Sequence, residues 1–169
     1  MRESIKANRK MQRLLSKEIG ADRLDPELLA LLQSGFSNRY GCIFYAGFEQ
    51  SVSSRARRKE LWDKTGIECS ANHIHLEDYV KLDPLVQFRQ AVLFVKQLAR
   101  LLGRSYPRTS FRVILSVNRD GAIVRFHKVR AGEEWLSDDL EGYKDDALYV
   151  LTISPDGKCS HERKRFWKN

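Results

Sequence analysis

A long amphipathic segment, followed by short alternating ones, constrains the fold of this chain more than any other feature. Asp83 and Pro84 form a helix-start signal, because an aspartate caps free backbone N–H groups and a proline at the first helical position lacks only an N–H that would be unpaired. After them, apolar side chains recur every three or four positions, as on the buried face of a helix. They are Leu85, Phe88, Val92, Val95, Leu98, Ala99 and Leu102. The pattern predicts a helix over residues 84–102 that ends at Gly103.

The segments after this helix alternate apolar and polar residues, which is the period of a strand with one buried face. The turn residues Asn118 to Gly121 favour a hairpin between the first two segments. Strands are expected over residues 111–117, 123–129 and 147–153, with a fourth short strand beginning at Lys158. Because such a sheet has to bury its apolar face, we expect an α+β fold in which the helix packs on a C-terminal antiparallel β-sheet.

The N-terminal half is predicted to consist mainly of helices. The expected elements are a basic, peripheral helix over residues 2–19, a helix from Asp25-Pro26 to Gly35, a strand over 40–47 and a helix from Ser53 or Ser54 to near Gly66. The chain has no internal repeat, low-complexity tract or linker, and a length of 169 residues suits one domain. We therefore expect residues 1–169 to form a single α+β domain.

The composition excludes several classes of protein. A hydrophobic content of 42% and an aromatic content of 10% are too high for a disordered chain. No apolar run approaches the roughly 18 residues of a membrane span, and the segment from Met1 to Lys6 lacks the apolar core of a signal peptide. Cys42, Cys69 and Cys159 are odd in number and lack CxxC spacing, which favours reduced thiols. We expect a cytoplasmic protein with no membrane partner.

The charge of the chain is divided between two regions of opposite sign. There are 30 Lys and Arg residues against 22 Asp and Glu residues, a net charge of +8. Within residues 133–156, however, eight carboxylates face one lysine, so this window carries −7 and the rest of the chain +15. The carboxylates are Glu133, Glu134, Asp138, Asp139, Glu141, Asp145, Asp146 and Asp156. Crowded carboxylates repel each other, whereas opposite a cationic cleft they speed association, so the long connection over residues 130–146 is a candidate protein interface.

The aromatic residues of this connection allow two interpretations. Trp135 or Tyr143 could anchor an interface, as aromatic hot spots do. Alternatively, Trp135 and Leu136 only pin the connection onto the sheet, while the carboxylates point to water.

Two other hypotheses rest on basic clusters and on a histidine pair. A nucleic-acid-binding regulator would use basic residues to neutralise phosphates and aromatic rings to stack on bases. The basic clusters are Arg9-Lys10, Arg55–Lys59 and Arg163–Lys168. A metal-dependent enzyme would use His73 and His75, whose spacing on a strand points both imidazoles to one face, with Cys69 or Glu77 as a further ligand. Alternatively, both histidines are hydrogen-bonded residues of a polar edge strand.

The C-terminal part of the chain also resembles a known group of proteins. Residues 125–136 read Arg-Phe-His-Lys-Val-Arg-Ala-Gly-Glu-Glu-Trp-Leu, and residues 139–143 read Asp-Leu-Glu-Gly-Tyr. This pattern of a strand, a Gly-Glu-x-Trp turn and a final apolar strand resembles small immunity proteins encoded beside bacterial polymorphic toxins, including those of contact-dependent growth inhibition systems. The resemblance covers about residues 111–153 and contains no catalytic signature.

The resemblance implies a cytoplasmic, non-enzymatic protein that binds the C-terminal toxin domain of its own system and blocks its active site, without metal or cofactor. Many such toxins are nucleases with cationic clefts, in which acidic residues would mimic phosphate. The expected toxin contacts are Glu133, Glu134, Trp135, Asp138, Asp139, Glu141 and Tyr143. Inhibitors of nucleases are usually acidic throughout, so a chain of +8 meets its toxin either through the acidic connection alone or through a basic face.

Overall fold

The computed structural model describes residues 1–17, 23–48, 63–81 and 83–156. Within these ranges, a five-stranded antiparallel sheet has the order β1 (Arg2–Ala7), β7 (Ala147–Ser154), β5 (Phe111–Asn118), β6 (Gly121–Lys128) and β4 (Ile74–His75). A separate hairpin consists of β2 (Phe36–Arg39) and β3 (Cys42–Tyr45). The helices are α1 (Arg9–Leu15), α2 (Pro26–Gln33), α3 (Lys64–Ala71) and α4 (Pro84–Ser105), and η2 (Leu76–Asp78) and η3 (Leu140–Gly142) are short 3-10 helices.

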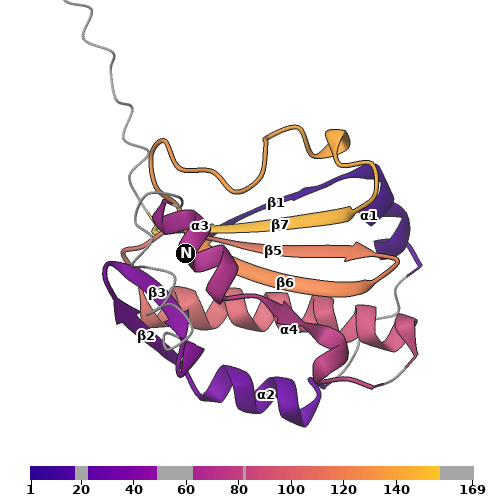
Figure 1. Cartoon of the computed structure of the whole chain (residues 1–169), viewed down its shortest axis with the longest axis horizontal. Coiled ribbons are helices and arrows are strands. Elements are labelled where there is room, and N and C mark those ends of the chain that lie inside the picture. Colours follow the sequence, from indigo (N-terminus) through magenta and orange to yellow (C-terminus); the bar gives the residue numbers. More distant parts are fainter. Residues whose placement is uncertain (18–22, 49–62, 82, 157–169) are drawn as a thin grey trace, which may run out of the picture.

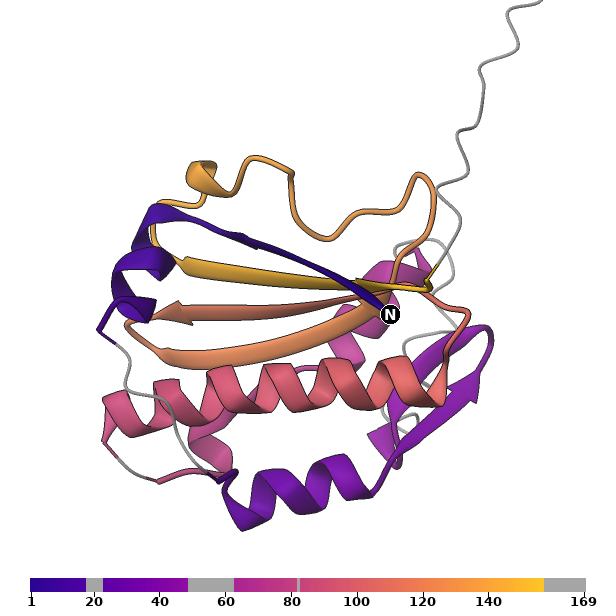
Figure 2. The same ribbon diagram turned by 180° about the vertical axis from the view of Figure 1, so that it is seen from behind.

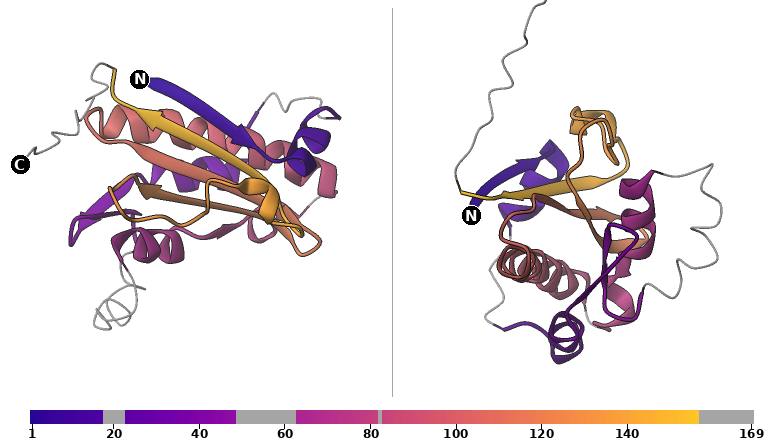
Figure 3. Two further views of the ribbon diagram at one scale, coloured as in Figure 1. Left: turned by 90° about the horizontal axis from the view of Figure 1, so that it is seen from above. Right: turned by 90° about the vertical axis from the view of Figure 1, so that its left-hand side faces the viewer.

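The large sheet separates two layers (Figures 1 and 2). α4 lies along one face of the sheet, and α2 packs against α4. α3 and the long connection between β6 and β7 lie on the other side, as the right-hand view of Figure 3 shows. The arrangement confirms the predicted α+β fold, with the long helix packed on a C-terminal antiparallel sheet. No helix in the described ranges has the length and apolar character needed to cross a membrane.

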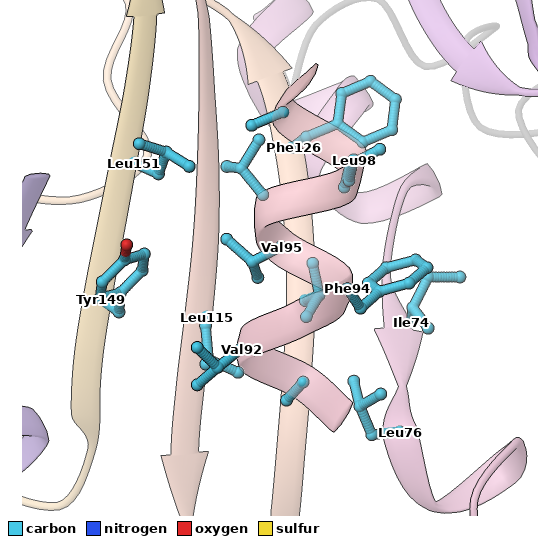
Figure 4. Close-up of a cluster of buried hydrophobic side chains, with 14 of the residues drawn as sticks. Ile74, Leu76, Val92, Phe94, Val95, Leu98, Leu115, Phe126, Tyr149 and Leu151 are labelled. Carbon is cyan, nitrogen blue, oxygen red and sulfur yellow. The ribbon is translucent and has the colours of Figure 1, made fainter. Parts of the chain in front are cut away.

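The main hydrophobic core lies between α4 and the sheet. Every second side chain of β5, β6 and β7 points at the helix, as the two-residue period of a strand requires. Val95 and Leu98 of α4 face the strands, and Figure 4 shows them beside the strand residues of the core. The strand residues there include Leu115, Phe126 and Leu151, and each is at most 2% exposed. These are residues whose spacing predicted the helix and the strands.

Gly103 lies inside α4, so the predicted end of the helix at this glycine is wrong. The helix continues to Ser105, and the Tyr106 N–H still donates to the Leu102 carbonyl O at 2.9 Å. Gly103 instead allows close packing, because a Cβ there would lie 2.9 Å from Met1 Cε and 3.7 Å from Ile153 Cδ1. The missing side chain therefore makes room for the start of β1 and the end of β7.

The predicted helix over residues 2–19 is wrong in its first third. Residues 2–7 form β1, which pairs with β7 from Arg2 opposite Ser154 to Ala7 opposite Tyr149. Without β1, the backbone groups along this edge of the buried strand β7 would lack partners, and pairing them outweighs the helical spacing of the segment. α1 begins only after Asn8, whose side chain accepts the Met11 N–H at 3.0 Å as an N-cap.

The other N-terminal predictions are confirmed in part. α2 begins at Pro26 as expected, and Gly35 follows it with a φ of 76°. The expected strand over 40–47 is present as β3, and β2 is its unpredicted partner across a turn in which Tyr40 and Gly41 both have positive φ.

The fourth predicted helix and strand fall largely outside the described ranges. α3 begins at Lys64, where Asp63 caps it by accepting the Gly66 N–H at 2.6 Å, and it continues to Ala71, beyond the expected end near Gly66. The predicted helix start at Ser53 or Ser54 and the strand from Lys158 lie outside the described residues.

Two buried polar side chains, one in α3 and one at its C-cap, attach the small hairpin to the large sheet. Asn72 donates to the Ile43 and Phe126 carbonyls at 2.8 and 3.2 Å and accepts the Tyr45 N–H at 3.1 Å. Glu68 accepts the N–H groups of Ile43 and Lys128 at 2.7 and 2.8 Å. Both side chains therefore satisfy backbone groups of β3 and β6 that would otherwise be buried without partners.

Glu68 also forms a two-fold ion pair with Arg130, which lies two residues after the end of β6. The Arg130 Nη1 and Nη2 atoms lie 2.7 and 2.8 Å from the two Glu68 carboxylate oxygens. The Glu68 side chain is 0% exposed and that of Arg130 is 14% exposed. The charge pair is thus buried and has its hydrogen bonds satisfied, which is the condition under which a buried ion pair is tolerated.

We expect Glu68→Ala to lower the free energy of unfolding by about 3–5 kcal/mol, because it leaves a buried guanidinium and two buried N–H groups without partners. Urea denaturation followed by circular dichroism measures this change. Glu134→Ala, at an exposed position, is the matched control and should change the stability by less than about 0.5 kcal/mol. Equal stability of the two variants would contradict the role given to Glu68.

Candidate functional site

The connection over residues 130–146, here called the acidic loop, lies across the sheet face opposite α4 (Figure 1). Its apolar residues form a second small core with the sheet: Trp135, Leu136, Leu140 and Tyr143 pack on Ile114, Leu148 and Val150. The guanidinium of Arg125 lies 5.9 Å from the centre of the Trp135 ring, within the range of a cation–π contact. Trp135 and Tyr143 therefore help to hold the loop on the sheet.

Asn8 holds the C-terminal end of the acidic loop. Its Nδ2 donates to the carbonyl oxygens of Asp146 and Leu140 at 2.9 and 3.4 Å, and its Oδ1 accepts the Leu148 N–H at 3.0 Å. The same oxygen caps α1 through Met11, and the residue is only 2% exposed. One buried amide therefore joins the N-terminal segment, the loop and β7.

Arg130 and Glu133 hold the N-terminal end of the loop. Glu133 accepts the Thr65 N–H of α3 at 2.9 Å, and its carboxylate lies 4.0 Å from the Arg130 guanidinium. Burial by itself would raise the pKa of Glu133, but the hydrogen bonds from Thr65 and the charge of Arg130 lower it below the ordinary value. Glu133 is thus occupied inside the protein rather than presented to a partner.

Asp146 accepts hydrogen bonds from Ser116 and Asn118 at 2.9 and 3.0 Å, whereas the other five carboxylates of the loop project into solvent and form a surface that we call the acidic ridge. Its members are Glu134, Asp138, Asp139, Glu141 and Asp145. Asp138 pairs with Lys6 of β1 at 2.7 Å, and the hydrogen bond and charge of Lys6 lower its pKa. Glu141 accepts the Arg9 N–H at 2.9 Å, and Asp139 accepts the Glu141 N–H at 3.1 Å. These contacts fix the ridge, while its charges remain at the surface.

The seven residues predicted as toxin contacts are therefore divided by the structure. Glu134, Asp138, Asp139 and Glu141 are exposed on the ridge. Glu133 is bound to α3, and Trp135 and Tyr143 are half-buried against the sheet. Asp145 belongs to the ridge but was not in the predicted set, although the charge window contained it. Asn8 was also not singled out; its position just before a helix is the N-cap signal that could have indicated it.

Of the histidine pair, His75 belongs to β4 and His73 lies just before it, on the same side of the sheet as the loop. The His73 and His75 rings are 4.4 Å apart between centroids, so both point to one side as predicted. His73 Nε2 lies 3.2 Å from Arg125 Nη2, and His75 Nδ1 lies 3.0 Å from Glu77 Oε1. Burial, followed by the charge of Arg125, lowers the pKa of His73 to about 4. A guanidinium directed at the ring nitrogen occupies the position that a metal ion would need.

Of the two further predicted ligands, Cys69 is buried, whereas Glu77 is half-buried and contacts His75. No group of three or more His, Cys, Asp or Glu side chains with metal-site geometry occurs within the described ranges. Burial raises the pKa of Cys42 to about 11 and raises that of Cys69 further above its ordinary value. Both thiols are therefore protonated at neutral pH, and a protonated thiol is a poor nucleophile and metal ligand.

The basic clusters of the nucleic-acid hypothesis are only partly described. Arg9 lies at the start of α1, with Lys10 following it, and both are exposed. Because residues 2–7 form a strand, the expected long basic helix is absent from the described N-terminal segment. Arg55–Lys59 and Arg163–Lys168 lie outside the described residues.

Comparison with known proteins places the chain in a family. Residues 6–161 match the family model described as Uncharacterized protein PM0498 family. The chain belongs to this family. A relative from Pasteurella multocida (strain Pm70), described as Uncharacterized protein PM0498, is 30% identical over 142 residues, covering 76% of this chain and 86% of the relative. No solved structure matches the chain. The matched range in the PM0498 family includes Asn8, α3 and the whole acidic loop.

Asn8→Ala should lower the free energy of unfolding by about 2–3 kcal/mol, because it removes an N-cap and leaves buried polar groups of the loop and β7 without partners. Hydrogen exchange should speed up at residues 140–148, and urea denaturation measures the stability. Gln12→Ala, which removes an exposed hydrogen bond to the Ala7 carbonyl in the same region, is the control and should have a small effect. Unchanged exchange in the loop would show that Asn8 does not hold it.

We expect His73 to make the protein less stable as the pH falls from about 6.5 towards about 4. Because its pKa is lowered in the folded state, the unfolded chain takes up a proton in this window and the folded chain does not. Urea denaturation at about pH 7 and about pH 4.5 should therefore show a smaller loss of stability for His73→Asn than for the unchanged chain. Arg125→Gln should raise the pKa of His73 in an NMR titration, and Arg119→Gln should leave it unchanged. An equal loss of stability at low pH in His73→Asn and in the unchanged chain would contradict the pKa given to His73.

Proposed function

We propose that this protein is a cytoplasmic, non-enzymatic immunity protein that binds a cognate bacterial toxin domain stoichiometrically and blocks its active site through the acidic ridge. The observation that carries the proposal is a set of five exposed carboxylates on a loop whose backbone is held by buried contacts at both ends. The segment that resembles immunity proteins of polymorphic toxin systems coincides with β5, β6, the acidic loop and β7.

A rigid ridge is suited to fast and selective binding of a basic protein surface. Binding costs less when the interacting loop is already ordered, because little conformational entropy is lost. Carboxylates that repel each other in the free protein become favourable opposite a cationic cleft, which speeds association and excludes acidic partners. A nuclease, whose cleft binds phosphates, is the toxin type that such a ridge matches best.

The chemistry of the other candidate groups supports binding rather than catalysis. Cys42 and Cys69 are buried with raised pKa values, and His73 faces Arg125 instead of a free cavity. The ridge carboxylates lie on the surface, where water screens them, and the cavity that Asp138 lines, of about 40 Å³, is too small for a substrate. We therefore assign the acidic loop a role in recognition.

The net charge of +8 is compatible with an acidic contact surface, because the cations of α4 lie on the other side of the sheet from the acidic loop. The acidic loop lies on one face of the sheet, whereas α4, on the other face, contains no acidic residue. The field close to the ridge is determined by the nearest charges, since salt screens those beyond about 8–10 Å. A basic chain can thus meet its toxin through an acidic surface.

The first test is co-expression of the chain with the C-terminal domain encoded by the gene immediately upstream. If the proposal is right, the two proteins co-purify in a one-to-one complex, and the chain abolishes the toxicity of the domain. An upstream gene that encodes no variable C-terminal domain of a secreted protein, or a domain that does not bind, would refute it.

Charge reversal on the ridge then tests the contact surface. Glu134→Lys/Asp145→Lys alters two exposed carboxylates that have no hydrogen bond or ion pair within the part of the chain described, so it should leave the fold intact. We expect the affinity for the toxin domain, measured by calorimetry, to fall at least about tenfold, mostly through slower association.

The matched control is Glu27→Lys/Asp78→Lys, with the same change of charge at exposed positions of α2 and η2. It should bind like the unchanged chain. Equal affinity of the ridge variant and this control would exclude the ridge from the interface, while leaving the one-to-one complex to be explained by another surface.

A further inference from the structure

A row of three cations runs along the outer surface of α4. Lys96, Arg100 and Arg104 are four residues apart, which places them on one face of the helix at intervals of about 6 Å. All three are exposed, and none forms a hydrogen bond or an ion pair with any described residue. α4 has no acidic residue in its 22 positions, so the row is not neutralised within its own helix.

Two open grooves with apolar floors flank this row. The groove between α2 and α4 has a volume of about 310 Å³, and Leu29, Leu32 and Leu101 line it together with Gln33 and Gln97. Leu29 is 39% exposed, which is high for a large apolar side chain. The groove on the other side of the row, about 190 Å³, lies between α4 and the ends of β1 and β7. Arg100 and Arg104 line both grooves.

The second groove has the same mixture of apolar floor and cationic wall. Met1, Ala99, Gly103 and Ile153 form its floor, and Glu3 is its single acidic lining residue. Met1 is 40% exposed. The surface therefore combines apolar contact area with two arginines that bind carboxylates bidentately when a partner supplies them.

We propose that this face of α4 is a second docking surface, which binds an acidic amphipathic segment of a partner protein. Apolar side chains of that segment would enter the grooves beside Leu29 and Met1, and its carboxylates would pair with Arg100 and Arg104. The proposal does not depend on the acidic ridge, because α4 and the acidic loop lie on opposite sides of the sheet.

The lining of the grooves favours a protein segment over a nucleic acid. Single-stranded nucleic acids bind where aromatic rings lie between cations, since the bases stack on them. Neither groove has an aromatic lining residue, and aliphatic and amide side chains form the floor instead. Grooves with aliphatic residues at the base and arginines along the sides match an amphipathic helix that has leucines on one face and glutamates on the other.

Fluorescence anisotropy with the full chain and three labelled probes tests the proposal. The first probe is a helical peptide with leucines on one face and glutamates on the other, the second has glutamine for every glutamate, and the third is a single-stranded RNA oligonucleotide. We expect saturable binding of the acidic peptide, at least about tenfold weaker binding of the glutamine peptide, and loss of the acidic-peptide affinity with rising salt.

Arg100→Glu/Arg104→Glu should weaken acidic-peptide binding at least about tenfold, whereas the matched control Lys81→Glu/Arg119→Glu should change it less than about twofold. Leu29→Asn should weaken it as well, because it removes apolar contact area from the groove. Circular dichroism checks that the exposed substitutions leave the fold unchanged.

Four outcomes would overturn the proposal. They are no saturable binding of the acidic peptide, equal binding to the Arg100→Glu/Arg104→Glu variant, equal binding of the glutamine peptide, and displacement of the peptide by RNA from the same residues. Self-association of the chain alone that the double variant abolishes would identify a second copy as the occupant and would also exclude the foreign segment. None of these results bears on whether the acidic ridge binds a toxin.

Discussion

The buried ion pair between Glu68 and Arg130 is the interaction on which much of the remaining structure depends. It joins α3, the β3 strand and the start of the acidic loop, because the same carboxylate that binds Arg130 also accepts N–H groups of Ile43 and Lys128. Removing both charges from water is costly, and the pair is stable only because each carboxylate oxygen is hydrogen-bonded more than once. The position of the loop therefore follows from the position of α3.

The acidic loop is ordered although it is long and charged, and this order lowers the entropy that a binding loop would lose. Arg130 holds its beginning, Asn8 holds its end, and Leu140 is buried against the sheet between them. The surface that results has carboxylates on one side of the molecule and the cations of α4 on the other. A protein divided in this way can present an acidic surface and a basic surface to different partners, since screening limits the reach of each.

The sequence predicted helices and strands well where their apolar residues follow a single period and are buried on one face. α4 and the strands β5 to β7 were identified because their apolar residues follow the periods of 3.6 and 2 that packing against each other requires. Residues 2–7 were assigned to a helix because their spacing is ambiguous, and only the unpaired edge of β7 makes them a strand. β2 has four residues of mixed polarity, so its pairing with β3 left no periodic signal.

The site shows the same division between what local sequence encodes and what distant contacts decide. Composition alone located the dense carboxylates of residues 133–146, and five of them are exposed in the structure. Which carboxylates face solvent depended on partners far along the chain, such as Thr65 for Glu133 and Ser116 for Asp146. The sequence by itself determined the fold class and the charge of the loop, because periodicity and composition are local properties. Only the tertiary structure decided which charges are exposed, because hydrogen bonding and burial depend on residues brought together by folding.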